Sequence, residues 1–205
     1  SEVLLNVLAS ELQRVGTPRV MPADIFAAVS AVYRRCRGGY AAVAMVIGHG
    51  LLGFRDPNGI RPLVLGQRET PKGAEWMLAS ESVALDMLGF KLLRDVAPGE
   101  VVYIDELGRL HTQVCVATAR HTPCIFEYVY FARPDSLIDN ISVHRARMRM
   151  GDALAELLVI NISVSLLASF VPVPGGVGVA EFGLTLGLTS AGMTPEAAVA
   201  AVLLY

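Results

Sequence analysis

Charged side chains are confined almost entirely to the first three quarters of this 205-residue chain. Of 17 basic and 19 acidic residues, only Glu181 and Glu196 lie beyond residue 156, so the preceding part carries a balanced set of charges. Burying an unpaired charge is costly, and a segment with almost no charges is therefore suited to apolar surroundings. The sequence predicts a body of soluble type over 1–156 and a hydrophobic tail of membrane-protein type over 157–205.

Net charge and cysteine usage narrow the classes of function. A formal net charge of −2 gives no reason to expect nucleic-acid binding. The three cysteines, Cys36, Cys115 and Cys124, form no CxxC pair and suit a reducing compartment. No secretory signal is visible and the first residue is not Met, so we expect a cytoplasmic body and an excised fragment. We expect this chain to bind no metal and no cofactor.

The apolar pattern of the body predicts helices and a set of short strands. Apolar residues recur at helical spacing in some segments, whereas runs of apolar and β-branched residues between turn signals indicate strands. The expected helices cover residues 1–15, 23–37, 83–89 and 142–156. The expected strands cover residues 40–47, 51–54, 62–66, 75–80 and 124–131, with a meander over 92–116. This order predicts an α+β fold with mainly antiparallel sheets.

A polar turn follows the expected strand 51–54. The sequence Pro-Asn-Gly at 57–59 is typical of a turn, because Pro presets φ while Asn and Gly tolerate the left-handed region. Charges so close to buried strands are usually paired with each other or with backbone groups. The candidate site residues of this turn are Arg55, Asp56, Asn58, Gly59 and Arg61.

Four stretches, in the same order, resemble one enzyme family. They are SEVLLN at 1–6, FRDPNGIRPLVLG at 54–66, ASESVALD at 79–86 and FEYVYFARPDS at 126–136. Together they resemble the glutaminase domain of the amidophosphoribosyltransferases, over about residues 1–156. The resemblance implies an incomplete N-terminal-nucleophile hydrolase (class II glutamine amidotransferase) sandwich of antiparallel sheets and helices, with an apolar helical tail.

The resemblance also implies a chemistry. Members of this family use glutamine and phosphoribosylpyrophosphate to form 5-phosphoribosylamine, the first step of purine synthesis. They are homo-oligomers that bind phosphoribosylpyrophosphate with Mg²⁺, and some carry an iron–sulfur cluster. The family's nucleophilic cysteine would precede Ser1, and its transferase domain would follow Glu156. We therefore assign no catalytic residue and expect this chain by itself to be inactive.

Several body residues have a functional and a structural interpretation. The charged residues of the polar turn could shape a glutamine site, or they could hold the turn between packed strands. Cys36 follows two arginines that could lower its pKa, but the end of a helix opposes a thiolate. Cys124 occupies a position where some relatives ligate the cluster, which one cysteine cannot hold. His49 suits a turn, and His144 could meet phosphate or lie on a solvated helix face.

The tail contains apolar segments around a Pro- and Gly-rich turn. Residues 157–180 carry no charge, but Pro172 and Pro174 end the apolar run early. The segments 182–191 and 195–204 are too short to span a membrane singly.

The tail over 159–205 resembles the flippase-like bacterial membrane proteins related to lysylphosphatidylglycerol synthases. That resemblance implies that Glu181 is an intramembrane acid and that the tail contacts a membrane. The alternatives are a membrane-associated fragment carried by a cytoplasmic appendage, a non-functional chimera, and an apolar graft that packs on the body or aggregates. The tail residues that carry the resemblance are Pro174, Gly175, Gly176, Gly178 and Glu181.

Overall fold

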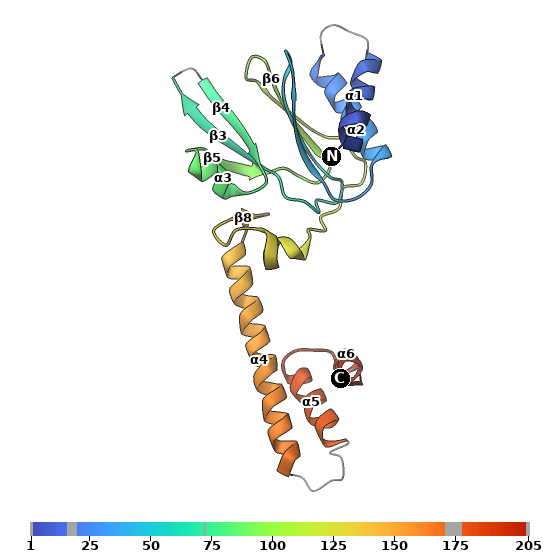
Figure 1. The fold of residues 1–205 in the computed structure, drawn as a ribbon, viewed down its shortest axis with the longest axis vertical. Helices are drawn as coiled ribbons and strands as arrows, with labels where there is room; N and C mark the ends of the chain where they lie inside the picture. Colours follow the sequence, from blue (N-terminus) through green and yellow to red (C-terminus); the bar gives the residue numbers. More distant parts are fainter. Residues whose placement is uncertain (1, 16–19, 72, 171–177, 204–205) are drawn as a thin grey trace. The chain divides into compact units, whose positions relative to one another are not determined.

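The chain forms two compact units, Ser1–Ala146 and Arg147–Tyr205. Figure 1 shows the elements of both units, coloured along the sequence. The computed structural model describes the residues in the ranges 2–15, 20–71, 73–170 and 178–203.

The first unit is built around a four-stranded antiparallel sheet that carries two helices on one face (Figure 1). Its strands lie in the order β1 (Ala41–Val46), β2 (Gly50–Arg55), β6 (Glu100–Asp105), β7 (Leu110–Val114). The helices are α1 (Glu2–Val15) and α2 (Pro22–Arg35), which confirms the two predicted N-terminal helices. The core between helices and sheet contains Leu8, Ile25, Val29, Val32, Leu52, Phe54 and Val101, all buried. Burial of these apolar side chains is the main stabilising contribution to this layer.

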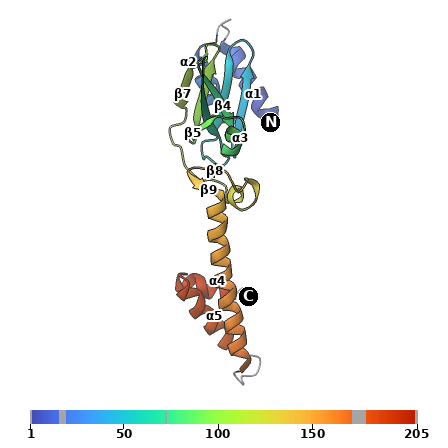
Figure 2. The same ribbon diagram turned by 90° about the vertical axis from the view of Figure 1, so that its left-hand side faces the viewer.

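A second antiparallel sheet covers the other face of the first sheet (Figure 1; Figure 2). Its order is β4 (Gly73–Ala79), β3 (Val64–Thr70), β5 (Lys91–Asp95). The two sheets pack closely at Gly53, where an added Cβ would lie 2.5 Å from Leu78 Cδ1. Helix α3 (Ser82–Met87) packs on this sheet, and Leu85 occupies the space that a side chain at Gly66 would need. The buried core between the sheets consists of Leu63, Leu65, Val96, Val102 and Ile104.

Two sequence predictions in this unit are wrong. The expected meander over 92–116 is divided, because β5 pairs with β3 of the second sheet, whereas β6 and β7 pair within the first. The expected strand over 124–131 is helical, since Glu127–Phe131 forms one π-helical turn labelled η1. Tyr128 and Ala132, four residues apart, pack into one small core with Ile138 and Val143. That packing overrides the β-propensity of the aromatic residues.

The second unit consists of helices from the tail. Helix α4 (Val143–Phe170) begins in the first unit and continues past the predicted end at 156 without interruption. It is followed by α5 (Val179–Ser190) and α6 (Pro195–Leu203), which confirms the predicted apolar helical tail. Within the described ranges, no helix is both long enough and apolar enough to cross a membrane. Pro172, Pro174 and the glycines at 175–176 lie outside the described residues.

Candidate functional site

Asp56 organises the polar turn that follows β2. Its carboxylate is fully buried and accepts hydrogen bonds from four backbone N–H groups. Oδ1 accepts from Asn58 at 2.9 Å and Ile60 at 3.2 Å, while Oδ2 accepts from Arg61 at 3.1 Å and Tyr40 at 3.3 Å. A buried carboxylate is tolerated only when it is satisfied in this way. Asp56 therefore holds the turn and has little remaining capacity for a ligand.

Gly59 closes the same turn. It adopts a φ of +61°, and an added Cβ would lie 2.8 Å from Pro98 Cγ. Both the left-handed backbone and the close approach favour glycine here. The preceding Asn58 presents its backbone carbonyl to Thr122, which donates from N at 2.8 Å and from Oγ1 at 3.1 Å. The turn is thereby fixed against the segment that carries residues 120–124.

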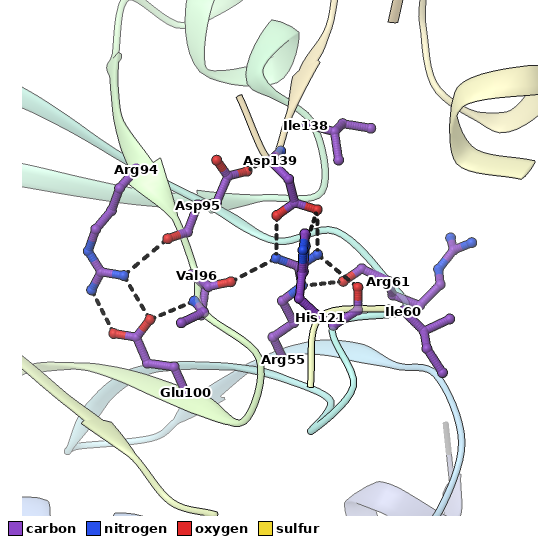
Figure 3. Close-up of polar contacts among 12 residues, drawn as sticks. Arg55, Ile60, Arg61, Arg94, Asp95, Val96, Glu100, His121, Ile138 and Asp139 are labelled. Carbon is purple, nitrogen blue, oxygen red and sulfur yellow. Dashed lines mark hydrogen bonds and ion pairs between the residues drawn. The ribbon is translucent and has the colours of Figure 1, made fainter. Parts of the chain in front are cut away.

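Arg55 lies at the centre of the network, as Figure 3 shows, and is 1% exposed. Its guanidinium donates to the backbone carbonyls of Arg61 at 2.8 Å, Val96 at 2.9 Å and Gly59 at 2.9 Å. It also donates twice to Asp139, at 2.8 and 3.0 Å. A guanidinium has five N–H donors, and all five are used within the protein. Arg55 is therefore a structural cation in this arrangement.

Asp139 reaches Arg55 from a two-residue hairpin. Strands β8 (Leu137–Ile138) and β9 (Ile141–Ser142) flank Asp139 and Asn140, whose φ angles are +49° and +61°. Positive φ at both central positions defines a type I′ turn, and Asp and Asn tolerate that conformation better than most residues. The hairpin thus directs one carboxylate at the buried guanidinium (Figure 3).

The Asp139 carboxylate has a second partner. His121 Nε2 lies 3.0 Å from Asp139 Oδ2, and the His121 side chain is half exposed. Burial raises the pKa of the Asp139 carboxyl, but the hydrogen bonds from Arg55 and His121 outweigh it and leave that pKa below its usual value. Asp139 is therefore ionised over the physiological range and completes a buried ion pair.

Acidic residues of β5 and β6 fix the neighbouring turn. Asp95 Oδ1 accepts from the backbone N–H of Asp139 at 3.0 Å, and burial raises the pKa of Asp95. Arg94 forms a bidentate pair with Glu100, with both distances at 2.7 Å. Glu100 Oε2 also accepts from the N–H of Ala97 at 2.7 Å. These contacts hold the carbonyl of Val96 where Arg55 uses it (Figure 3).

Arg61 is the turn residue whose charged group reaches solvent. Its side chain is 45% exposed, forms an ion pair with Glu127 and lies over the Phe131 ring at 5.8 Å from the centroid. Burial raises the pKa of Glu127, and the nearby Arg61 opposes that rise. Among the predicted site residues of the turn, Arg61 is thus the most exposed.

Of the remaining candidates, Cys124 lies beside the turn, because its backbone N–H donates to the carbonyl of Ile60 at 3.3 Å. Cys36, Cys115 and Cys124 are free thiols. The backbone carbonyl of His49 accepts from Tyr103, and the backbone N–H of His144 donates to Pro134. In the part of the chain that the structure describes, no three His, Cys, Asp or Glu side chains are placed to hold a metal ion.

Glu181 has a local role at the start of α5. Its Oε2 accepts from the backbone N–H of Gly178 at 2.6 Å, which satisfies one donor at the helix N-terminus. A negative side chain there also complements the helix dipole.

Sequence reasoning missed Asp139 and His121, which belong to the same network as Arg55. Asp139 and Asn140, two turn-forming residues, stand between the apolar residues Ile138 and Ile141, which is a hairpin signal. That signal could have predicted the turn. The partnership with Arg55, 84 residues earlier, has no local signal.

Comparison with known proteins gives close relatives for the N-terminal three quarters of the chain. An amidophosphoribosyltransferase of Pseudomonas aeruginosa is 62% identical over 156 residues, which are 76% of this chain and 31% of that protein. The Escherichia coli protein of the same name is 59% identical over 157 residues, again 31% of its length. The Saccharomyces cerevisiae protein is 47% identical over 178 residues. The chain thus spans about a third of the length of these relatives.

Two solved structures also resemble this chain. One described as the allosteric regulatory enzyme of purine biosynthesis has a TM-score of 0.60 and 34% identity, covering 73% of this chain and 30% of that one. A glutamine phosphoribosylpyrophosphate amidotransferase from B. subtilis, complexed with ADP and GMP, has a TM-score of 0.58 and 29% identity, covering 90% and 37%. The predicted α+β fold of a class II glutamine amidotransferase is thereby confirmed. No protein-family model matches the chain, and the flippase-like resemblance of the tail stays a prediction.

Proposed function

We propose that residues 1–156 are a segment of the glutamine-hydrolysing part of an amidophosphoribosyltransferase. The observation that carries this proposal is the 62% identity over 156 residues to the Pseudomonas aeruginosa protein. The buried network of Arg55, Asp56 and Asp139 joins the turn of the 54–66 stretch to the β8–β9 hairpin in one piece. In the whole enzyme, this piece would help to form the scaffold of a glutaminase.

The proposal includes the reaction of the whole enzyme. Glutamine would supply ammonia, which would replace pyrophosphate on phosphoribosylpyrophosphate and yield 5-phosphoribosylamine. Mg²⁺ would accompany phosphoribosylpyrophosphate, and the enzyme would be a homo-oligomer in the cytoplasm. The segment described here would contribute positioning of the glutaminase fold and no reacting group. Arg61, exposed beside Phe131, is the residue best placed to face a ligand or an adjoining part of the enzyme.

A segment replacement tests this proposal. Residues 1–156 replace the matching 156 residues of the Pseudomonas aeruginosa enzyme, and glutamate release and growth of a purine-requiring strain are measured. We expect both activities, because a scaffold at 62% identity should support the recipient's catalytic groups. The same replacement carrying Arg55→Met is the control and should fail to fold stably. A replacement enzyme that is soluble and cooperatively folded yet hydrolyses no glutamine would contradict the proposal.

A second function, membrane contact, is proposed for the tail on a separate observation. Large apolar side chains on α4 are more than half exposed, and charges are almost absent beyond residue 156. Such a surface favours an apolar partner, and a flippase-like fragment held against a bilayer is one such case. The exposed side chains are Leu158, Val159, Ile162 and Leu166.

Membrane fractionation tests this second function. Pelleting with membranes that resists carbonate and is lost on deleting residues 159–205 would support it. A full-length chain that remains soluble and monodisperse without detergent would contradict it.

A further inference from the structure

Helix α4 presents a stripe of uncovered apolar side chains. Its members recur at every fourth position and are each more than half exposed, namely Leu154, Leu158, Ile162 and Leu166. Residues four apart lie on the same side of an α-helix, so the stripe runs about 18 Å along the helix axis. An exposed patch of this kind marks a surface that meets an apolar partner.

The apolar surface of the second unit is not confined to α4. Helix α5 packs against α4 through Gly183 and Gly187, and α6 packs against α5 (Figure 1; Figure 2). Both short helices expose further large apolar side chains, which are Phe182, Leu186, Val199 and Leu203. A second copy of the chain would cover one seam and leave the other faces in water. A bilayer surface can cover apolar side chains of all three helices, and it is the occupant that fits this distribution.

Charged groups in the N-terminal half of α4 face away from the stripe. The helical repeat of 3.6 residues places Arg149, Asp152 and Glu156 on the side of α4 opposite Leu154 and Leu158. All three charged residues are exposed. This half of the helix can therefore lay its apolar side on a bilayer while its charges stay in water.

A further charge lies at the other end of the α4–α5 pair. Gly183 lies against Val164 and Gly187 against Ile160, so the two helices run antiparallel. Glu181, which is exposed at the start of α5, is thereby placed near the C-terminal end of α4. A pair that stood upright in a bilayer would carry one charged end into hydrocarbon, where ionised side chains are costly. With the helix axes parallel to the membrane surface, both ends remain at the interface.

The lengths of the helices agree with this orientation. Helix α5 has 12 residues and α6 has 9, which makes them about 18 and about 14 Å long. The uncharged part of α4, over 157–170, is about 21 Å long. The hydrocarbon of a bilayer is about 30 Å thick, whereas a helix lying in the surface buries its apolar face by only about 5–10 Å.

The charge of the second unit narrows the class of lipid. Residues 147–205 contain two arginines, Arg147 and Arg149, and four acidic residues, Asp152, Glu156, Glu181 and Glu196, so their net charge is −2. Anionic lipid attracts surfaces rich in Lys and Arg. This unit is therefore suited to a zwitterionic surface, where burial of apolar side chains supplies the binding free energy.

We propose that the second unit binds a membrane as a monotopic element, with α4, α5 and α6 lying in the plane of a zwitterionic bilayer surface. The proposal rests on the membrane contact proposed above for the tail, and it adds the orientation and the class of lipid. The stripe of α4 faces the acyl chains, while Arg149, Asp152, Glu156 and Glu181 stay in water. Because the contact is apolar, salt does not release it.

Vesicle flotation of the full chain tests the partner. We expect the chain to float with phosphatidylcholine vesicles at low and at high salt. Adding phosphatidylglycerol should not strengthen binding, because the unit carries a net negative charge. Binding that requires phosphatidylglycerol and is lost at high salt would overturn the assignment of a zwitterionic surface.

Depth-dependent fluorescence quenching tests the orientation. The variants Leu158→Trp, Ile162→Trp and Leu166→Trp are bound to vesicles whose lipids carry bromine at a shallow or a deep acyl position. The signal of Trp76, measured in the wild-type chain, is subtracted. The three positions span about 12 Å of helix. In the proposed orientation they lie at the same depth, whereas in an upright helix the quenching shifts between the two bromine positions along the series.

Ser163→Trp is the matched control. Ser163 is exposed and lies on the same side of α4 as Glu156, so its tryptophan should be quenched little in a chain that floats. All four replaced side chains are exposed, so the substitutions should leave the helices intact. Amide exchange in α5 of each variant verifies this. If one stripe variant loses protection, the other two still give the depth comparison.

Three further outcomes would overturn the inference. They are a depth that changes steadily along the stripe, equal quenching of Ser163→Trp and the stripe variants, and self-association in solution that replaces vesicle binding. In the first two cases the chain still floats, so membrane contact stands and the orientation alone is wrong. In the third case a second copy occupies the stripe. A monomeric chain that floats with neither lipid contradicts the proposed membrane contact itself.

Discussion

At the residue scale, the Arg55–Asp139 pair connects the polar turn after β2 to the β8–β9 hairpin, across a separation of 84 residues. Arg55 is 1% exposed and the Asp139 side chain is 10% exposed, so each buried charge is compensated by the other. A buried pair need not stabilise a fold more than apolar residues would, but removing one partner leaves an uncompensated charge. The pair is therefore expected to be sensitive to single substitutions.

Asp139→Ala should destabilise the first unit strongly. It leaves the Arg55 guanidinium buried with two unsatisfied donors, which costs about 3–5 kcal/mol in comparable cases. Denaturant unfolding followed by the fluorescence of Trp76, the single tryptophan, measures the loss. Asp135→Ala is the control, because Asp135 and Arg133 are more than half exposed and such pairs contribute little to stability. Equal losses in the two variants would contradict this account.

The contribution of the Arg55–Asp139 pair to the stability of the fold decreases in acid. The folded-state pKa of Asp139 is lowered, so its contribution is present above the unfolded pKa, about 3.9 for Asp, and is lost as pH falls through the folded value. The stability advantage of wild type over Asp139→Asn should be complete above about pH 5 and shrink in more acidic solution. Unfolding free energies measured across this range give the test. An advantage that grew on acidification would refute it.

At the element scale, helix α5 depends on two glycines spaced four residues apart. An added Cβ would lie 2.8 Å from Val164 Cγ1 at Gly183 and 2.3 Å from Ile160 Cγ2 at Gly187. Small residues at this spacing let two helix backbones approach closely. Helix α5 can therefore pack closely on α4 because Gly183 and Gly187 have no side chains.

Gly187→Ala should loosen the second unit. The new methyl group overlaps Ile160, and overpacking typically costs about 1–3 kcal/mol. Faster amide exchange in α5 would reveal the change. Gly151→Ala is the matched control in α4, because no atom lies within 4 Å of its added Cβ. That control should stabilise its helix by about 1 kcal/mol through helix propensity.

The segment 124–131 shows how an element can depend on distant residues. Its aromatic and β-branched composition predicted a strand, but its backbone forms helical turns. In this helical form Tyr128 packs against Ile138 and Val143, and Glu127 pairs with Arg61. Local propensity differs between helix and strand by a small amount, and tertiary packing readily reverses it.

At the scale of the whole molecule, this chain by itself is expected to show no glutaminase activity. Burial raises the pKa of the Cys115 thiol, which disfavours the reactive thiolate. Cys36 lies at the C-terminal end of α2, where the helix dipole opposes a negative charge. Glutamate release should remain at background, while the segment-replacement enzyme provides the positive control. Release that Cys36→Ala abolished would contradict this prediction and assign the nucleophile.

The sequence by itself determined the features that depend on neighbouring residues. Helical spacing located α1, α2 and α3, turn residues located the break after β2, and the distribution of charge separated the apolar tail. These patterns are readable because periodicity and turn chemistry act over a few residues. Four motifs in order also indicated the family fold, which the relatives confirm.

Only the tertiary structure decided how distant segments combine. It assigned β5 to the second sheet, made 127–131 helical and brought Asp139 to Arg55. It also showed that all five donors of Arg55 are used inside the protein, which separates a structural cation from a ligand-binding one. The physical reason is that these outcomes depend on burial and on partners far away in sequence, and no local pattern carries that information.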